Sequence, residues 1–286
     1  MFPARFDYVA ARTVEEAIAA KATGDETRFL AGGQSLIPMM KTRLAVPAKL
    51  VDINRIPDLD GLERVDGHLR VGALVRHAQI VQSDLAFGAI ASAAPWISDP
   101  LVRNLGTMCG SVAHCDPEGD WNSVLLATGA DVVARGSNGE RVISITEFVV
   151  DLFTNALADD EMVTEVRIPM PSGRAGGSYQ KLERKVGDYA TVAVAAHLEL
   201  DADGAISKAG VALTAVAPVN RKVNAAEEVL VGSQPGEAVF AEAAEVAAHA
   251  AEPRDDVRGT SDWKRNVVRV FTRRALAAAA AQAQGS

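Results

Sequence analysis

The chain has 286 residues, of which 48% are hydrophobic and 23% charged, and its formal net charge is −8. This length suits two compact domains. The acidic balance argues against nucleic acid or an anionic membrane as the main partner, because either needs a basic patch. The first residues lack the basic start and apolar core of a signal peptide, and no apolar run is long enough to span a bilayer. We therefore expect a cytoplasmic protein without a membrane span.

Cysteine usage limits the metal chemistry that the chain can support. Two cysteines, Cys109 and Cys115, are too few for a disulfide framework. A cysteine-ligated iron–sulfur cluster needs about four thiolates, so this chain does not supply a full set. Cys109, His114 and Cys115 lie close together, but their ligand count favours a loop that merely contains them over a metal site.

The first fifty residues alternate helical and extended patterns. A capping-box sequence, T-V-E-E, opens a helical pattern over residues 13–22, and apolar runs at 27–31 and 49–53 are typical of buried strands. Between these runs, residues 36–44 have the spacing of a helix. We therefore predict a small parallel unit in which AGGQS (residues 31–35) lies at the turn from strand to helix.

The middle of the chain mixes strands and helices. Its clearest feature is a hairpin over residues 131–145, whose turn carries Asn138-Gly139. A capped helix is predicted over residues 115–130, with Asp116 at the N-cap. The other predicted elements are strands at 68–74 and 161–171, helices at 76–86 and 86–97, and an irregular segment that begins at 98 and leads into the capped helix.

The last third of the chain has a different pattern. Residues 171–177, PSGRAGG, have the composition of a linker. Three antiparallel strands are predicted within residues 178–219, with a turn at Asp203-Gly204. Helical patterns follow at 225–232, 237–252 and 261–282. The fold class is therefore α+β, with a larger N-terminal part and a C-terminal part of sheet plus helices.

Two glycine-containing segments are candidates for phosphate binding. In AGGQS, Gly32 and Gly33 offer backbone amides and Ser35 adds a hydroxyl at a helix start, where an anion is favoured. A plain tight turn is the alternative, since the segment matches neither G-x-G-x-x-G nor a P-loop. The second segment, GTMCGS (residues 106–111), again combines two glycines with hydroxyl side chains.

An acidic residue after the second segment has two interpretations. Asp120 either complements the helix start or accepts hydrogen bonds from ribose or ribitol hydroxyls. Two phosphate-binding segments on separate stretches suit a pyrophosphate, and hence a dinucleotide. The sequence holds no G-x-S-x-G nucleophile motif, no two-metal cluster and no recognisable acid–base set. We expect a chain that holds a cofactor, with neither catalytic residues nor metal ligands of its own.

Four stretches together resemble one known family. They lie at residues 30–53, 103–121, 179–196 and 256–276, in the family's order. The family is the FAD-binding medium subunit of molybdenum hydroxylases, which includes xanthine dehydrogenase and carbon monoxide dehydrogenase. The similarity extends from near residue 1 to about residue 277.

The resemblance implies a fold and its domains. We expect a PCMH-type FAD-binding domain over residues 1–175, made of two α/β subdomains at about 1–55 and 56–175. A C-terminal domain with an antiparallel sheet and helices, like that of the carbon monoxide dehydrogenase flavoprotein, is expected over residues 176–286.

The resemblance also implies a set of FAD-binding residues. The first segment matches the family's A-G-G-x-S pyrophosphate loop, and the second matches its usual T-I-G-G-N loop. Asp120 matches an acidic position near the ribityl chain, and Val163 matches a backbone contact to the flavin ring. Lys181 and Tyr189 match residues that border the ring, although Tyr189 also suits a half-buried strand tyrosine. The implied residues are Ala31, Gly32, Gly33, Gln34, Ser35, Leu36, Thr107, Cys109, Gly110, Ser111, Asp120, Val163, Lys181 and Tyr189.

The second segment departs from the family pattern at two positions. Cys109 replaces a glycine, and it would be strained if the position needed a positive φ. Ser111 replaces an asparagine and is able to make fewer hydrogen bonds. Either change would weaken FAD binding or alter the flavin potential.

The implied function is electron transfer within a complex. Electrons would pass from a molybdenum cofactor on a large subunit, through two [2Fe–2S] clusters on a small subunit, to FAD on this chain. The acceptor beyond FAD would be NAD, oxygen or a quinone-linked carrier, and the complex a dimer of heterotrimers. Two alternatives stay open: a stand-alone flavin oxidoreductase of the same fold, and a scaffold subunit that has lost its flavin.

Overall fold

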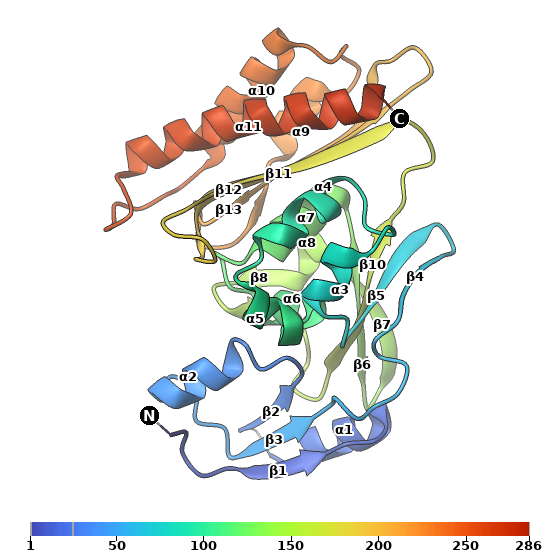
Figure 1. The fold of residues 1–286 in the computed structure, drawn as a ribbon, viewed down its shortest axis with the longest axis vertical. Coiled ribbons are helices and arrows are strands. Elements are labelled where there is room, and N and C mark those ends of the chain that lie inside the picture. The colour runs from blue at the N-terminus through green and yellow to red at the C-terminus, as the bar shows by residue number, and fades with distance from the viewer. Residues whose placement is uncertain (1, 25, 286) are drawn as a thin grey trace.

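The structure is a computed structural model that describes residues 2–24 and 26–285. The three larger sheets follow one another along the long axis of the molecule (Figure 1). The N-terminal sheet lies at one end, a middle unit of strands and helices follows, and the C-terminal sheet with its helices lies at the other end. The α+β prediction is confirmed.

The N-terminal unit is a three-stranded parallel sheet with two helices. Thr13 caps the first helix by accepting a hydrogen bond from the backbone N–H of Glu16, as the capping-box pattern predicts. The predicted parallel unit is confirmed, but a first strand at Asp7–Ala10 was missed. Its elements are β1 (Asp7–Ala10), α1 (Val14–Lys21), β2 (Thr27–Leu30), α2 (Leu36–Thr42) and β3 (Lys49–Asp52), with strand order β1-β3-β2.

The middle unit has a five-stranded antiparallel sheet of order β4-β5-β10-β6-β7. The predicted hairpin is confirmed, and Gly139 adopts φ +103° in its turn. The strands are β4 (Leu62–Val65), β5 (His68–Gly72), β6 (Asp131–Gly136), β7 (Gly139–Ser144) and β10 (Met162–Pro169), with a small hairpin of β8 (Val149–Asp151) and β9 (Thr154–Asn155). The helices are α3 (His77–Gln82), α4 (Gly88–Ala93), the 3₁₀ turn η1 (Ala94–Trp96), α5 (Pro100–Leu105), α6 (Met108–His114), α7 (Asp120–Thr128) and α8 (Ile145–Phe148).

Two sequence predictions in this unit are wrong. The segment predicted as irregular from residue 98 contains the short helices α5 and α6, which are capped by the side chains of Asp99 and Thr107. Helix α7 does not begin after Asp116: the Asp116 carboxylate accepts from the backbone N–H of Glu118 within a turn, and Gly119 is the N-cap. A capping aspartate and a turn aspartate use the same side-chain chemistry, so the sequence did not separate them.

The C-terminal unit is an antiparallel sheet covered on one face by helices (Figure 1). The three predicted strands and the Asp203-Gly204 turn are confirmed, with Gly204 at φ +83°. The predicted linker is shorter than expected, because residues 171–174 complete the turn and β11 begins at Ala175. The elements are β11 (Ala175–Glu183), β12 (Ala190–Leu200), β13 (Ile206–Thr214), β14 (Arg221–Lys222), α9 (Asn224–Leu230), α10 (Glu237–Ala250) and α11 (Ser261–Gln284).

The opposite face of this sheet packs directly on α4 and α7 of the middle unit. A Cβ atom at Gly210 would lie 1.7 Å from the carbonyl oxygen of Ala127, and one at Gly177 would lie 2.4 Å from the backbone nitrogen of Ala89. Glycine is needed at both positions because backbone touches backbone. The C-terminal sheet is therefore held against the helices that carry the candidate site.

Candidate cofactor-binding site

The first glycine segment joins β2 to α2 in the N-terminal unit. Gly33 adopts φ +70°, a left-handed conformation that favours glycine. A Cβ atom at Gly32 would lie 2.2 Å from the carbonyl oxygen of Leu105, at the end of α5. Any larger residue at position 32 would therefore push apart the N-terminal and middle units. The two glycine segments predicted from the sequence meet at this contact.

The backbone amides of this segment find no acceptor in the part of the chain that the structure describes. Among residues 2–24 and 26–285, no hydrogen-bond partner is present for the backbone N–H groups of Gly32 through Leu36. Gln34 turns its side-chain amide back to the carbonyl oxygen of Gly32, at 3.1 Å, and Ser35 makes no capping bond. Unpaired amides at a helix start favour an anion such as a phosphate.

The second segment is the start of α6 rather than a loop. Thr107 is its N-cap, and its hydroxyl oxygen accepts from the backbone N–H of Gly110 at 3.1 Å. Ser111 lies in the second turn of the helix, partly buried. The predicted glycine loop is therefore a capped helix N-terminus, in which the amides of Gly110 and Ser111 are already paired with Thr107.

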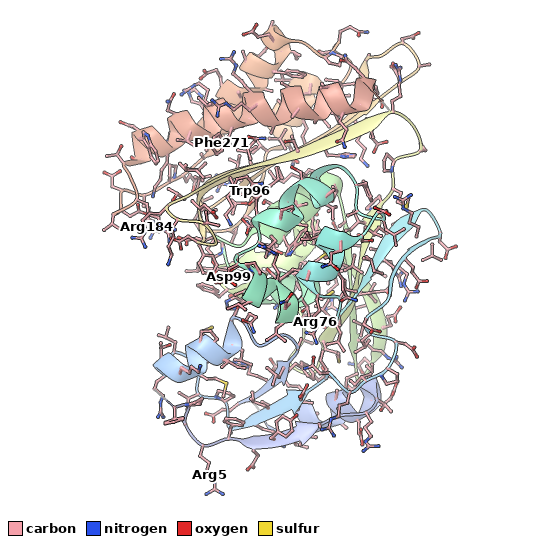
Figure 2. All side chains as sticks on the ribbon, in the orientation of Figure 1. Arg5, Arg76, Trp96, Asp99, Arg184 and Phe271 are labelled. Carbon is pink, nitrogen blue, oxygen red and sulfur yellow. The ribbon has the colours of Figure 1, made fainter. Side chains whose placement is uncertain are left out.

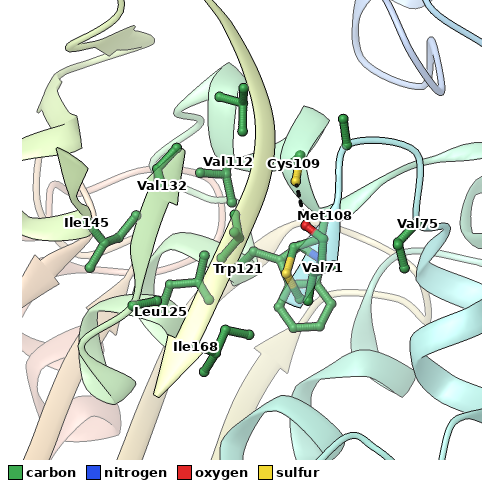
Figure 3. Close-up of a cluster of buried hydrophobic side chains, with 14 of the residues drawn as sticks. Val71, Val75, Met108, Cys109, Val112, Trp121, Leu125, Val132, Ile145 and Ile168 are labelled. Atoms are coloured by element: carbon green, nitrogen blue, oxygen red, sulfur yellow. Dashed lines mark hydrogen bonds between the residues drawn. The ribbon is translucent and has the colours of Figure 1, made fainter. Parts of the chain in front are cut away.

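Cys109 has a helical backbone, so the strain expected of a positive φ does not arise. Its thiol points into the core, where it is 2% exposed and donates to the carbonyl oxygen of Val71 at 3.4 Å (Figure 3). Burial raises the pKa of this thiol, which keeps it neutral. The departure from the family pattern fills the core without disturbing the backbone of the segment.

Two residues that the sequence reasoning missed hold the glycine segments together. Asn54, just after β3, donates from its side-chain amide to the carbonyl oxygen of Ala31 at 2.9 Å. Arg76, at the N-cap of α3, donates to the side-chain oxygen of Asn54 and to the carbonyl oxygen of Leu105, both at 2.6 Å. In Figure 2, Arg76 lies between the N-terminal unit and the helices of the middle unit. The signal available in the sequence was a polar residue directly after a parallel strand, where side chains of neighbouring strand ends gather.

His77 packs against Gly106, the first residue of the second segment. Its ring lies where a Cβ atom at Gly106 would approach to 2.9 Å, and its Nδ1 accepts from Trp121 Nε1 at 3.1 Å. Burial, with smaller contributions from the charges of Arg103 and Arg76, lowers the pKa of His77 to about 4. The ring is therefore neutral at physiological pH, and its hydrogen bond fixes the position of Trp121.

Asp120 and Lys181 form a buried ion pair between α7 and β11. Lys181 Nζ, on a side chain that is 1% exposed, lies 3.0 Å from one carboxylate oxygen of Asp120 and donates to the carbonyl oxygen of Trp96. The other carboxylate oxygen of Asp120 accepts from Tyr179 at 2.6 Å. Desolvation raises the pKa of Asp120, although the Lys181 charge opposes this. The two predicted residues are therefore brought together, and Lys181 also lies 3.5 Å from a carboxylate oxygen of Glu183.

Val163 and Tyr189 are the remaining two residues of the predicted set. Val163 is buried in β10 beside a β-bulge. Tyr189 lies in the loop that precedes β12 and not in the strand itself, and its side chain is 46% exposed. Partial burial and the carboxylate of Asp116 raise the pKa of Tyr189 to about 12. Within the described part of the chain, neither residue is hydrogen-bonded to another of the predicted site residues.

Known protein families and solved structures match nearly the whole chain. Residues 4–171 match the FAD binding domain in molybdopterin dehydrogenase, and residues 177–279 match the CO dehydrogenase flavoprotein C-terminal domain. The chain belongs to this family. The resemblance drawn from the sequence and the expected fold class are both confirmed.

Individual relatives support the family assignment. The carbon monoxide dehydrogenase medium chain of Hydrogenophaga pseudoflava is 35% identical, with 98% of each chain covered. The 6-hydroxypseudooxynicotine dehydrogenase complex subunit alpha of Paenarthrobacter nicotinovorans is also 35% identical, over 98% of this chain and 96% of the relative. The solved carbon monoxide dehydrogenase of H. pseudoflava superposes with a TM-score of 0.95 at 37% identity, covering 99% of both chains.

Two further observations concern metals and membranes. Over residues 2–24 and 26–285, no three or more His, Cys, Asp or Glu side chains gather into a candidate metal site. In the same part of the chain, no helix has the length and apolar character needed to cross a bilayer.

The Asp120–Lys181 pair predicts a large stability effect. Asp120→Asn removes the nearer of the two carboxylates that face the buried Lys181 ammonium and leaves only Glu183, 3.5 Å away, so we expect a loss of about 3 kcal/mol in the free energy of unfolding. The triple variant Asp120→Asn/Lys181→Met/Glu183→Gln removes all three charges and should be more stable than Asp120→Asn alone. Urea denaturation measures both. A single variant within 1 kcal/mol of wild type would contradict the buried pair.

His77 predicts a pH dependence of stability. Because its pKa is lowered from 6.5 to about 4, the unfolded state binds a proton first as pH falls. The free energy of unfolding therefore keeps its full value above pH 6.5. It decreases as the pH falls from 6.5 towards 4, by up to about 3 kcal/mol. His77→Asn keeps an acceptor for Trp121 but has no titrating group, so its stability should fall less over this range. If the urea midpoints of wild type and His77→Asn change equally with pH over this range, His77 does not contribute to the pH dependence of stability.

Proposed function

We propose that the chain is the FAD-binding, electron-transfer subunit of a heteromeric molybdenum hydroxylase. One observation carries the proposal: the contact of Gly32 with Leu105 places the unpaired amides of residues 32–36 beside the segment that leads to α6. This arrangement suits a dinucleotide pyrophosphate, because the unpaired amides of the first segment lie next to the start of a second helix, where an anion is favoured. Membership of the FAD-binding family supports it.

In this proposal, the chain's own residues bind and orient FAD. The amides of Gly32 through Leu36 and of the α6 start hold the pyrophosphate, Asp120 lies near the ribityl chain, and the backbone of Val163 contacts the ring. Lys181 and Tyr189 border the ring. When bound, FAD supplies the exchange of one or two electrons. We propose the boundary between the FAD-binding and C-terminal domains at residue 175.

We further propose that partner subunits carry the other redox groups. A large subunit would hold the molybdenum cofactor and a small subunit two [2Fe–2S] clusters, in a cytoplasmic dimer of heterotrimers. Both cysteines of this chain are buried, and Cys115 donates its thiol to the carbonyl oxygen of Val112, so neither is placed to ligate a cluster. Relatives described as a medium chain and as a subunit of a dehydrogenase complex support this composition. The acceptor beyond FAD would be NAD, oxygen or a quinone-linked carrier.

The absorbance spectrum of the protein purified from its native source tests the proposal. We expect a flavin spectrum together with iron–sulfur absorbance, and two co-purifying chains, one of them rich in cysteine. Flavin on a chain that purifies alone would favour a stand-alone oxidoreductase instead. A colourless chain that takes up no added FAD would contradict the cofactor assignment.

A further inference from the structure

A continuous set of hydrogen bonds links the two glycine segments through side chains. The Asn54 amide donates to Ala31 at the start of the first segment, and its oxygen accepts from Arg76. The other end of the Arg76 guanidinium donates to Leu105, just before the second segment. The path therefore runs from Ala31 through Asn54 and Arg76 to Leu105.

The far end of this path is the atom that limits the approach of the segments. The carbonyl oxygen of Leu105, which accepts from Arg76 at 2.6 Å, is also the atom nearest to the missing Cβ of Gly32. The guanidinium and the glycine contact thus act on the same carbonyl. The contact with Gly32 sets how closely the two segments approach, and the hydrogen bond from Arg76 keeps them from separating.

The near end of the path is anchored in the parallel sheet. Asp52, the last residue of β3, accepts from both the backbone N–H and the side-chain amide of Asn54, at 2.8 and 2.6 Å. Its other oxygen accepts from Tyr8 of β1 at 2.6 Å. These bonds hold Asn54 in one orientation, with its oxygen directed at Arg76.

We propose that Arg76 is a positioning residue for the pyrophosphate of FAD, acting through Asn54 and Leu105 to fix the spacing of the two glycine segments. The inference rests on the proposed function. A guanidinium suits this role because its planar fork reaches two acceptors at once with fixed geometry, whereas a lysine ammonium is a single point charge on a flexible stem. Both acceptors are neutral, so the bonds position the segments without an ion pair.

The experiment uses the full chain, freed of flavin, titrated with FAD and separately with ADP, which carries the pyrophosphate but no flavin ring. The variants are Arg76→Lys, Arg76→Met, Asn54→Ala and the double variant Arg76→Met/Asn54→Ala. Arg64→Met is the matched control, because Arg64 also donates to a backbone carbonyl, that of Leu85 at 3.2 Å, but contacts neither glycine segment. Thermal unfolding of each flavin-free variant reports whether it is folded.

We expect Arg76→Lys, Arg76→Met and Asn54→Ala each to weaken FAD and ADP binding about tenfold or more. The double variant should bind little worse than Arg76→Met, because both changes break one path. Arg64→Met should bind as wild type does. Wild-type affinity in Arg76→Lys would assign the effect to charge alone and overturn the proposal.

Two further results would also overturn it: wild-type affinity in Asn54→Ala, or losses that multiply in the double variant. If Arg76→Met fails to fold, Arg76→Lys and Asn54→Ala decide the question by themselves. A wild-type chain that binds no FAD would refute the proposed function, and this inference with it. A wild-type chain that binds FAD while every variant binds equally well would refute this inference alone.

Discussion

The close approach of Gly32 to the carbonyl oxygen of Leu105 is the contact on which the candidate site depends. It joins two units whose sheets are separate and whose strands run in different patterns, one parallel and one antiparallel. Only a residue without a Cβ permits it, because a side chain at this position would meet backbone atoms that have no room to move. The glycines of the first segment therefore have two effects. They allow the two segments to meet, and they leave the neighbouring backbone amides accessible.

The second half of the site is stabilised by polar contacts inside the core. His77 packs against Gly106 just before α6 and accepts a hydrogen bond from Trp121. The Asp120–Lys181 pair joins α7 to the first strand of the C-terminal sheet. Burying these groups is costly unless each is satisfied, so a folded chain must place all of them together. The C-terminal sheet therefore does more than cover the middle unit. It supplies Lys181, the lysine that pairs with Asp120 of α7.

Local patterns predicted much of the fold. The parallel unit, the Asn138-Gly139 hairpin and the three C-terminal strands follow from periodicity and turn chemistry, which act over a few residues. The first strand was missed because Asp7–Ala10 has only four residues and none of them is buried, so it lacks a clear apolar pattern. Helices α5 and α6 have only six and seven residues, too few to give a clear helical period in the sequence. Arg76 was missed because its partners Asn54 and Leu105 lie 22 and 29 residues away in the chain.

The central claim is that the unpaired amides of the first segment receive the pyrophosphate of FAD. Amide hydrogen exchange over residues 32–36, measured with and without FAD, tests it most directly, because an amide that donates no hydrogen bond exchanges quickly. The account predicts fast exchange in the flavin-free chain and marked slowing at these amides when FAD binds. Binding of FAD with no slowing there would show that the pyrophosphate lies elsewhere.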